Sequence, residues 1–269
     1  VVTVTVTNTF TIGSLEIEKR IDGPGAALYG AGPFEITIDC VLNGVPVTVP
    51  GGAARALTDA NGYTALYDTL PVGAVCGIEE TDQGGASSVE ITDDAANPIS
   101  EVTITGAATP TQVIVTNTFD LGSIEVSKFV WGDPNGDQQK RVFTIELRCE
   151  VAGNQITIPG GASRGLTVAD RVVYADLPVG ADCSLVETDN GGAVSTTMTP
   201  ADPTDASKAR VVVTGGAAAS IVVDNMYEIG LPLTGGERTM WILPFGGVLL
   251  LLGAALIVVR RVRRTRVTH

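Results

Sequence analysis

Each half of the chain places a lysine, a glutamate and an asparagine where a folded domain would bury them. Lys19, Glu80 and Asn117 each alternate in phase with apolar residues, so strands at these positions turn all three side chains inward. Such groups are costly to bury unless they pair or react with one another. Burial lowers a lysine pKa and raises a glutamate pKa, which provides a neutral amine as nucleophile and a protonated acid to polarise an amide.

The same three residue types return in the second half of the chain as Lys128, Glu187 and Asn225. They belong to an internal repeat of about 108 residues, in which VTNTFTIGSLEIEK recurs as VTNTFDLGSIEVSK. We expect one domain over residues 11–119 and a second over 120–228. Residues 1–10, which include Asn8, match only the end of a unit and are expected to be the last strand of a preceding repeat.

Short strands separated by glycine and proline turns are expected to carry these residues. Residues 34–40 alternate between apolar and polar, and Asn43-Gly44 predicts a hairpin turn after them. The second repeat shows the same alternation, with Gly153-Asn154 as its expected turn. Because neither repeat contains a convincing amphipathic helix, the fold class is all-β: tandem antiparallel β-sandwich domains of immunoglobulin-like or prealbumin-like type.

The four cysteines allow three disulfide pairings. Two lie in each repeat on inward faces, which favours Cys40 with Cys76 and Cys149 with Cys183 in an oxidising compartment. Two buried free thiols in each domain are the alternative.

The end of the chain has the composition of a membrane anchor. Residues 241–259 carry no charge and, as a helix, match the thickness of a bilayer core. Five arginines follow within residues 260–269, which predicts one transmembrane helix with a basic cytoplasmic tail and an extracellular body. The preceding linker, residues 229–240, contains the pentapeptide Leu231, Pro232, Leu233, Thr234 and Gly235.

This order of pentapeptide, apolar span and basic tail resembles the cell-wall sorting signal of Gram-positive surface proteins. The resemblance implies that a sortase cuts between Thr234 and Gly235 and joins the threonine to an amine of peptidoglycan or of a pilus. The chain would then be at the cell wall, after a transient single-pass membrane stage. A plain membrane anchor with a chance pentapeptide is the alternative.

The lysine, glutamate and asparagine pattern resembles the collagen-adhesin B-type repeats of Gram-positive surface proteins and pilins. It is more closely similar to a repeated domain of unknown function in actinobacterial wall-anchored proteins. The resemblance implies an autocatalytic isopeptide bond in each repeat: Lys19 to Asn117 with Glu80, and Lys128 to Asn225 with Glu187. The alternative is a buried lysine–glutamate ion pair beside an asparagine that caps a turn.

Composition excludes several other functions. The only histidine is His269, so no histidine-based catalysis or metal site is available, and no cofactor is expected. The net charge of -13 argues against nucleic acid as a partner. We therefore expect a non-enzymatic surface stalk that projects a more N-terminal region. One alternative is an adhesin that binds an extracellular ligand through the repeats. The other is a basal or terminal pilus subunit. A subunit of the pilus shaft is disfavoured, because it needs an exposed acceptor lysine and only Lys140 and Lys208 remain outside the core.

Overall fold

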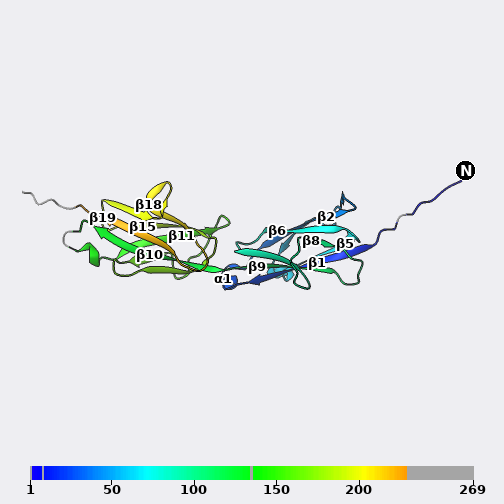
Figure 1. Cartoon of the computed structure of the whole chain (residues 1–269), viewed down its shortest axis with the longest axis horizontal. Coiled ribbons are helices and arrows are strands. Elements are labelled where there is room, and N and C mark those ends of the chain that lie inside the picture. Colours follow the sequence, from blue (N-terminus) through cyan, green and yellow to red (C-terminus); the bar gives the residue numbers. More distant parts are fainter. Residues whose placement is uncertain (1, 8, 134–135, 229–269) are drawn as a thin grey trace, which may run out of the picture. The chain divides into compact units, whose positions relative to one another are not determined.

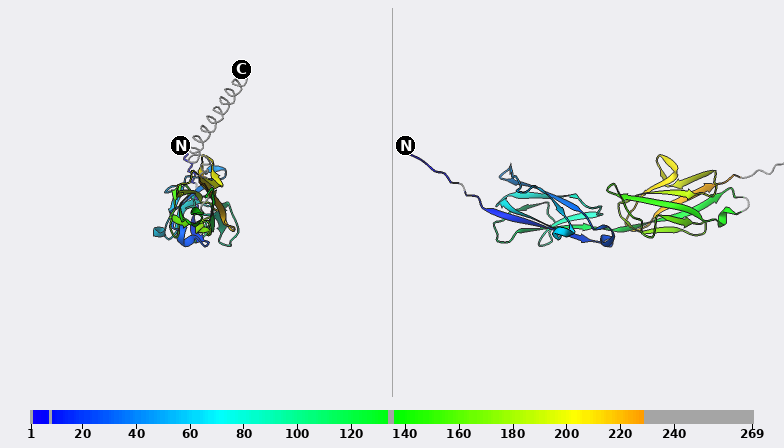
Figure 2. Two further views of the ribbon diagram at one scale, coloured as in Figure 1. Left: turned by 90° about the vertical axis from the view of Figure 1, so that its left-hand side faces the viewer. Right: turned by 180° about the vertical axis from the view of Figure 1, so that it is seen from behind.

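The computed structural model describes residues 2–7, 9–133 and 136–228, and the strands from Ile12 onward form two β-sandwich repeats (Figure 1). Within each repeat the strands run along a common direction, as the side views from the front and from behind show (Figures 1 and 2). Residues 2–7 and 9–11 lie outside any strand.

The first repeat consists of two facing sheets. One has the strand order β5-β1-β9-β7, with β1 (Ile12–Asp22), β5 (Thr64–Pro71), β7 (Ser88–Asp93) and β9 (Thr111–Thr118). The other has the order β3-β2-β6-β8, with β4 also paired to β2, and contains β2 (Phe34–Leu42), β3 (Val45–Pro46), β4 (Ala54–Leu57), β6 (Val75–Asp82) and β8 (Glu101–Thr103).

The second repeat has the same plan. Its first sheet has the order β14-β10-β19-β16, with β10 (Leu121–Trp131), β14 (Val172–Pro178), β16 (Ser195–Thr199) and β19 (Ala219–Met226). The facing sheet has the order β12-β11-β15-β18-β17, with β13 paired to β11, and contains β11 (Phe143–Val151), β12 (Asn154–Gln155), β13 (Ser163–Leu166), β15 (Asp182–Asp189), β17 (Ala201–Asp202) and β18 (Asp205–Val212).

Helical structure in the described residues is limited to single turns. These are α1 (Ala26–Tyr29) and the 3-10 turns η1 (Asp59–Asn61) and η2 (Gln138–Lys140). None is long and apolar enough to cross a membrane. The predicted transmembrane helix at 241–259, the linker with its pentapeptide and the basic tail lie outside the described residues, as does Asn8.

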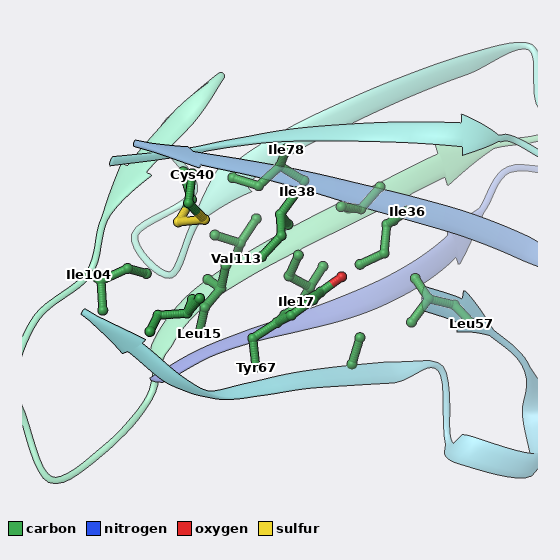
Figure 3. Close-up of a cluster of buried hydrophobic side chains, with 14 of the residues drawn as sticks. Leu15, Ile17, Ile36, Ile38, Cys40, Leu57, Tyr67, Ile78, Ile104 and Val113 are labelled. Carbon is green, nitrogen blue, oxygen red and sulfur yellow. A yellow bond between two sulfur atoms is a disulfide. The ribbon is translucent and has the colours of Figure 1, made fainter. Parts of the chain in front are cut away.

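The core of each sandwich lies between its two sheets. In the first repeat Leu15 and Ile17 on β1 pack against Ile36 and Ile38 on β2, and all four are at most 1% exposed. Figure 3 shows these side chains meeting between the ribbons, with Val113 of β9 among them. The alternating pattern of the sequence therefore lies on the predicted inward faces.

The first and last strands of each repeat pair in parallel, which differs from the purely antiparallel sandwich expected. Residue 15 of β1 lies opposite Thr111 and residue 22 opposite Thr118, so both strands run the same way. β10 and β19 do the same. Parallel neighbours need a long crossover connection, and here the intervening strands supply it. The chain consequently enters each repeat at one end of this strand pair and leaves at the other.

The second hairpin turn lies one residue before the position predicted. Val151 pairs with Asn154, so Ala152 and Gly153 form the turn, and both have positive φ. Asn43 and Gly44 do so in the first repeat, as predicted. Alanine is a poor residue for a left-handed conformation, which is why Gly153-Asn154 is the stronger sequence signal.

Candidate functional site

Lys19 is buried because its strand is amphipathic and the lysine falls in phase with the apolar residues. On β1 it follows Leu15 and Ile17 on the inward face, and it is 5% exposed. Its Nζ donates to the carbonyl oxygens of Val115, at 3.3 Å, and of Arg20, at 3.4 Å. The amine is therefore directed at the neighbouring last strand.

Asn117 is brought beside Lys19 by the parallel register. Lys19 pairs with Val115, and Asn117 is two residues further along β9, on the same face. Its side chain is completely buried. Nδ2 donates to the backbone oxygen of Gln83 at 2.9 Å, which fixes the orientation of the carboxamide. Among the described residues no donor reaches Asn117 Oδ1.

Glu80 joins the two from the facing sheet. Its strand, β6, points the carboxyl group inward, and Oε1 lies 3.3 Å from Lys19 Nζ. The same oxygen accepts a hydrogen bond from Asn117 Nδ2 at 3.2 Å. The lysine side chain is 0% and the glutamate side chain 1% exposed. One carboxyl oxygen thus contacts both the amine and the amide.

Burial dominates the electrostatics of this cluster. It lowers the pKa of Lys19 from 10.5 to about 8, against the opposing attraction of Glu80. It also raises the pKa of Glu80, although Lys19 and Asn117 favour its charged form. The Nζ atom stands 4.8 Å from the centroid of the Phe34 ring, a cation–π contact that favours the charged lysine. Both shifts favour the neutral amine and the protonated acid.

The second repeat assembles its own cluster from equivalent strands. Lys128 Nζ on β10 lies 2.8 Å from Glu187 Oε1 on β15, although not at the angle of a hydrogen bond. Phe143 takes the place of Phe34, with its ring centroid 4.6 Å from Nζ. Burial lowers the pKa of Lys128 as well, against Glu187 and Asp224. Asn225 is completely buried and donates from Nδ2 to the backbone oxygen of Asn190 at 3.1 Å.

The clusters differ in how the asparagine meets the acid. In the second repeat Thr196 Oγ1 donates to Asn225 Oδ1 at 2.9 Å and lies 3.4 Å from Glu187 Oε2. No direct hydrogen bond joins Glu187 and Asn225 within the described part of the chain. The residue pattern of the sequence does not single out Thr196, Phe34 or Phe143, because a threonine or phenylalanine at an inward strand position is common in any sandwich core.

The four cysteines form two disulfides, Cys40–Cys76 and Cys149–Cys183. Each joins directly paired residues of neighbouring strands, β2 with β6 and β11 with β15. The glutamate of each cluster lies four residues after the second cysteine on the same strand. Each disulfide therefore fixes, in the facing sheet, the strand that carries the acid. Among the described residues no group of histidine, cysteine or acidic side chains could hold a metal ion.

Residues 15–120 and 124–228 both match a family described as "Domain of unknown function (DUF5979)". The chain belongs to this family. Two DUF5979 domains thus cover both sandwiches, which supports the predicted resemblance to a repeated domain of unknown function. No curated protein matches the chain.

Several solved structures resemble the pair of DUF5979 domains at low identity. A variant of the major pilin of Streptococcus pyogenes is 14% identical, covering 80% of this chain and 99% of its own, with a TM-score of 0.44. A single B repeat unit of the collagen-binding surface protein of Staphylococcus aureus is 15% identical, with coverages of 80% and 98% and a TM-score of 0.26. A Mobiluncus mulieris adhesin containing disulfide, isopeptide and ester cross-links is 14% identical, with coverages of 74% and 86% and a TM-score of 0.33.

Proposed function

We propose that this chain is the stalk of a cell-wall-anchored surface protein, and that an isopeptide bond closes each repeat. The bonds join Lys19 to Asn117 and Lys128 to Asn225, with Glu80 and Glu187 as the respective acids. The observation that carries the proposal is that the side chains of a lysine, a glutamate and an asparagine are buried together in both repeats. In each case the lysine and asparagine belong to the adjacent first and last strands.

The proposed reaction replaces one amide with another. The neutral Lys19 Nζ attacks Asn117 Cγ, the new C–N bond forms, and the Cγ–Nδ2 bond breaks. A proton from the amine passes through Glu80 to Nδ2, which leaves as ammonia. The positions of the groups support this route, because Glu80 Oε1 contacts both the attacking and the leaving nitrogen.

The buried ion pair already holds the proton that this chemistry needs. A charged lysine with a charged glutamate has the same number of protons as a neutral amine with a protonated acid. Transfer within the pair therefore produces the reactive form without any exchange with solvent. Burial favours this transfer, since it lowers the pKa of Lys19 and raises that of Glu80.

A bond at this place would carry load through the stalk. The parallel strands β1 and β9 receive the chain at one end of the repeat and release it at the other. With Lys19 joined to Asn117, the covalent path runs directly from β1 to β9 and bypasses residues 20–116. Tension along the chain would then act on covalent bonds instead of on the hydrogen bonds between strands.

The proposed anchor is the sorting signal at residues 231–235, with sortase as the enzyme partner and a peptidoglycan or pilus amine as the acceptor. The order of pentapeptide, apolar span and arginines in the sequence supports it. The repeats themselves are not proposed to be an enzyme beyond their own cross-linking.

Intact mass spectrometry of the reduced full chain tests the cross-links. We expect a mass lower than the sequence mass by two ammonia molecules. Glu80→Gln keeps the shape of the side chain but removes its ability to carry the proton, so one ammonia should be regained. Glu187→Gln should regain the other.

Glu79→Gln is the matched control, because Glu79 neighbours Glu80 on β6 but is exposed on the outer face. This variant should retain the parent's mass deficit. A parent chain with its full sequence mass would refute the proposed bonds, and the buried clusters would then be ordinary ion pairs beside an asparagine.

A further inference from the structure

The two repeats treat the carbonyl oxygen of the reacting asparagine differently. In repeat 2 the oxygen, Asn225 Oδ1, accepts a hydrogen bond of 2.9 Å from Thr196 Oγ1. Thr196 stands directly opposite Asn225 in the register of β16 and β19. In repeat 1 the position opposite Asn117 is Val89 on β7. A methyl group there replaces the hydroxyl, and Asn117 Oδ1 is a buried acceptor with no donor in the described ranges.

The two carboxamides share one backbone contact, although only Asn117 Nδ2 also donates to the acid of its cluster, Glu80 Oε1, at 3.2 Å. Asn117 Nδ2 donates to the backbone oxygen of Gln83, and Asn225 Nδ2 donates to that of Asn190, at equivalent places in the two repeats. This shared contact orients the amide nitrogen in both repeats, and the residue opposite the asparagine in the sheet register is Val89 in repeat 1 and Thr196 in repeat 2. The repeats therefore differ in two contacts: repeat 2 has a donor to the carbonyl oxygen, and repeat 1 has a contact between the acid and the amide nitrogen.

Thr196 also reaches the acid of its cluster. Its Oγ1 lies 3.4 Å from Glu187 Oε2, while Glu187 Oε1 lies 2.8 Å from Lys128 Nζ. The Asn190 side chain donates to the same hydroxyl at 3.4 Å. The single hydroxyl hydrogen has two acceptors within reach, of which Asn225 Oδ1, at 2.9 Å, is nearer than Glu187 Oε2, at 3.4 Å. The hydroxyl therefore stands between the carboxyl group and the carbonyl that is to be attacked.

We propose that Thr196 is a catalytic residue of repeat 2, which stabilises the negative charge that develops on Asn225 Oδ1 when Lys128 attacks. This inference rests on the proposed isopeptide reaction. The balance of that reaction is unchanged: the Nζ–Cγ bond forms, the Cγ–Nδ2 bond breaks, and one amine proton leaves with ammonia. Thr196 is not consumed. Glu187 moves the proton while the hydroxyl of Thr196 stabilises the carbonyl oxygen. In repeat 1 Glu80 moves the proton without a hydroxyl group at the equivalent position.

A preorganised donor at a developing oxyanion accelerates acyl transfer by about 100-fold or more. Because the contact between Glu80 and Asn117 Nδ2 has no counterpart in repeat 2, the effect of the donor is measured within each repeat and not between the two. Thr196→Val should slow repeat 2 to a similar extent, and Thr196→Ser, which keeps the hydroxyl, should react at close to the parent rate. Val89→Thr should accelerate repeat 1, because it installs the hydroxyl opposite Asn117.

The rates can be measured on the full chain with one repeat silenced. Lys19→Ala leaves only repeat 2 able to react, and Lys128→Ala leaves only repeat 1. Each chain is synthesised in an oxidising cell-free translation reaction. Samples are quenched in denaturant at successive times and reduced, and their intact masses are measured by mass spectrometry. The readout is the fraction that has lost one ammonia. Formation of the Cys149–Cys183 disulfide in a parallel unreduced sample reports that repeat 2 has folded.

The outcomes separate this inference from the proposed function. Ammonia loss at the same rate in the Thr196→Val and parent chains overturns the role of Thr196 and leaves the isopeptide reaction intact. If Thr196→Val and Thr196→Ser slow ammonia loss equally, the catalytic role of Thr196 is also overturned, because the serine variant keeps the hydroxyl group. If Thr196→Val fails to form its disulfide, Val89→Thr decides, and an unchanged rate there counts against the inference. No ammonia loss from any chain refutes the isopeptide reaction and the inference with it.

Discussion

A chain that cannot cross-link repeat 1 should become more stable as the solution becomes alkaline. Asn117→Ala removes the carbonyl that Lys19 would attack and leaves the amine free to titrate. The folded repeat holds the pKa of Lys19 at about 8, whereas the unfolded chain has the ordinary value of 10.5. Between these values the unfolded state binds more protons, so the free energy of unfolding rises with pH.

The size of the effect follows from the two pKa values. Each pKa unit corresponds to about 1.4 kcal/mol, so the difference between 10.5 and about 8 amounts to about 3 kcal/mol. The gain should begin near pH 8 and be complete near pH 10.5. Below pH 8 Lys19 is charged in both states and contributes no slope.

Urea unfolding of Asn117→Ala and of Asn117→Ala/Lys19→Met across this range isolates the lysine. Repeat 2 is the same in both chains, and its contribution cancels. The contribution of Tyr67 also cancels. Burial raises the pKa of Tyr67 to about 12, so its titration lowers the free energy of unfolding at the highest pH values in both chains alike. Only the chain with Lys19 should gain stability between pH 8 and 10.5. Parallel pH profiles for the two chains would show that Lys19 is not held in an environment that disfavours its charge.

Two further predictions concern the disulfides and the anchor. Replacing Cys40 and Cys76 with alanine should lower the free energy of unfolding by about 4 kcal/mol, since the bridge closes a loop of 36 residues. Replacing Cys149 and Cys183, which close a loop of 34 residues, should lower it by about the same amount. Unchanged urea midpoints in both variants would contradict this prediction. In a sortase-competent Gram-positive cell, Thr234→Ala should leave the protein extractable with detergent, whereas the parent should need wall-degrading enzymes. Release of the parent by detergent alone would rule out sorting.

Sequence alternation was sufficient to predict the sandwich and the inward direction of the lysine, glutamate and asparagine. Alternation reports which face a side chain takes, and for Lys19 and Asn117 the structure has the predicted face. It does not report which strands are neighbours. The parallel pairing of β1 with β9 was therefore missed, although that pairing is what sets Asn117 beside Lys19.

Thr196 could not be found from the pattern for a related reason. It lies on β16, a short strand whose residues are mostly threonine and serine, so one hydroxyl among several carries no signal. Its proposed role depends on the register that sets it opposite Asn225, and register is a property of the folded sheet. Comparing the folded repeats identifies Thr196, because Val89 occupies the equivalent position in repeat 1.

The proposed reaction requires each repeat to fold first around an unfavourably buried lysine, and the disulfides are placed to offset this cost. Before any cross-link forms, each repeat must fold around a lysine whose charge burial disfavours, at a cost for Lys19 of about 3 kcal/mol at neutral pH. The disulfide of the same repeat contributes about 4 kcal/mol and joins strands of the facing sheet, so its formation does not require the reacting groups to have met. In the proposed sequence of events the disulfide thus offsets the cost of burying the reactive lysine. Loss of ammonia would then remove the buried lysine charge and make the link between the first and last strands permanent.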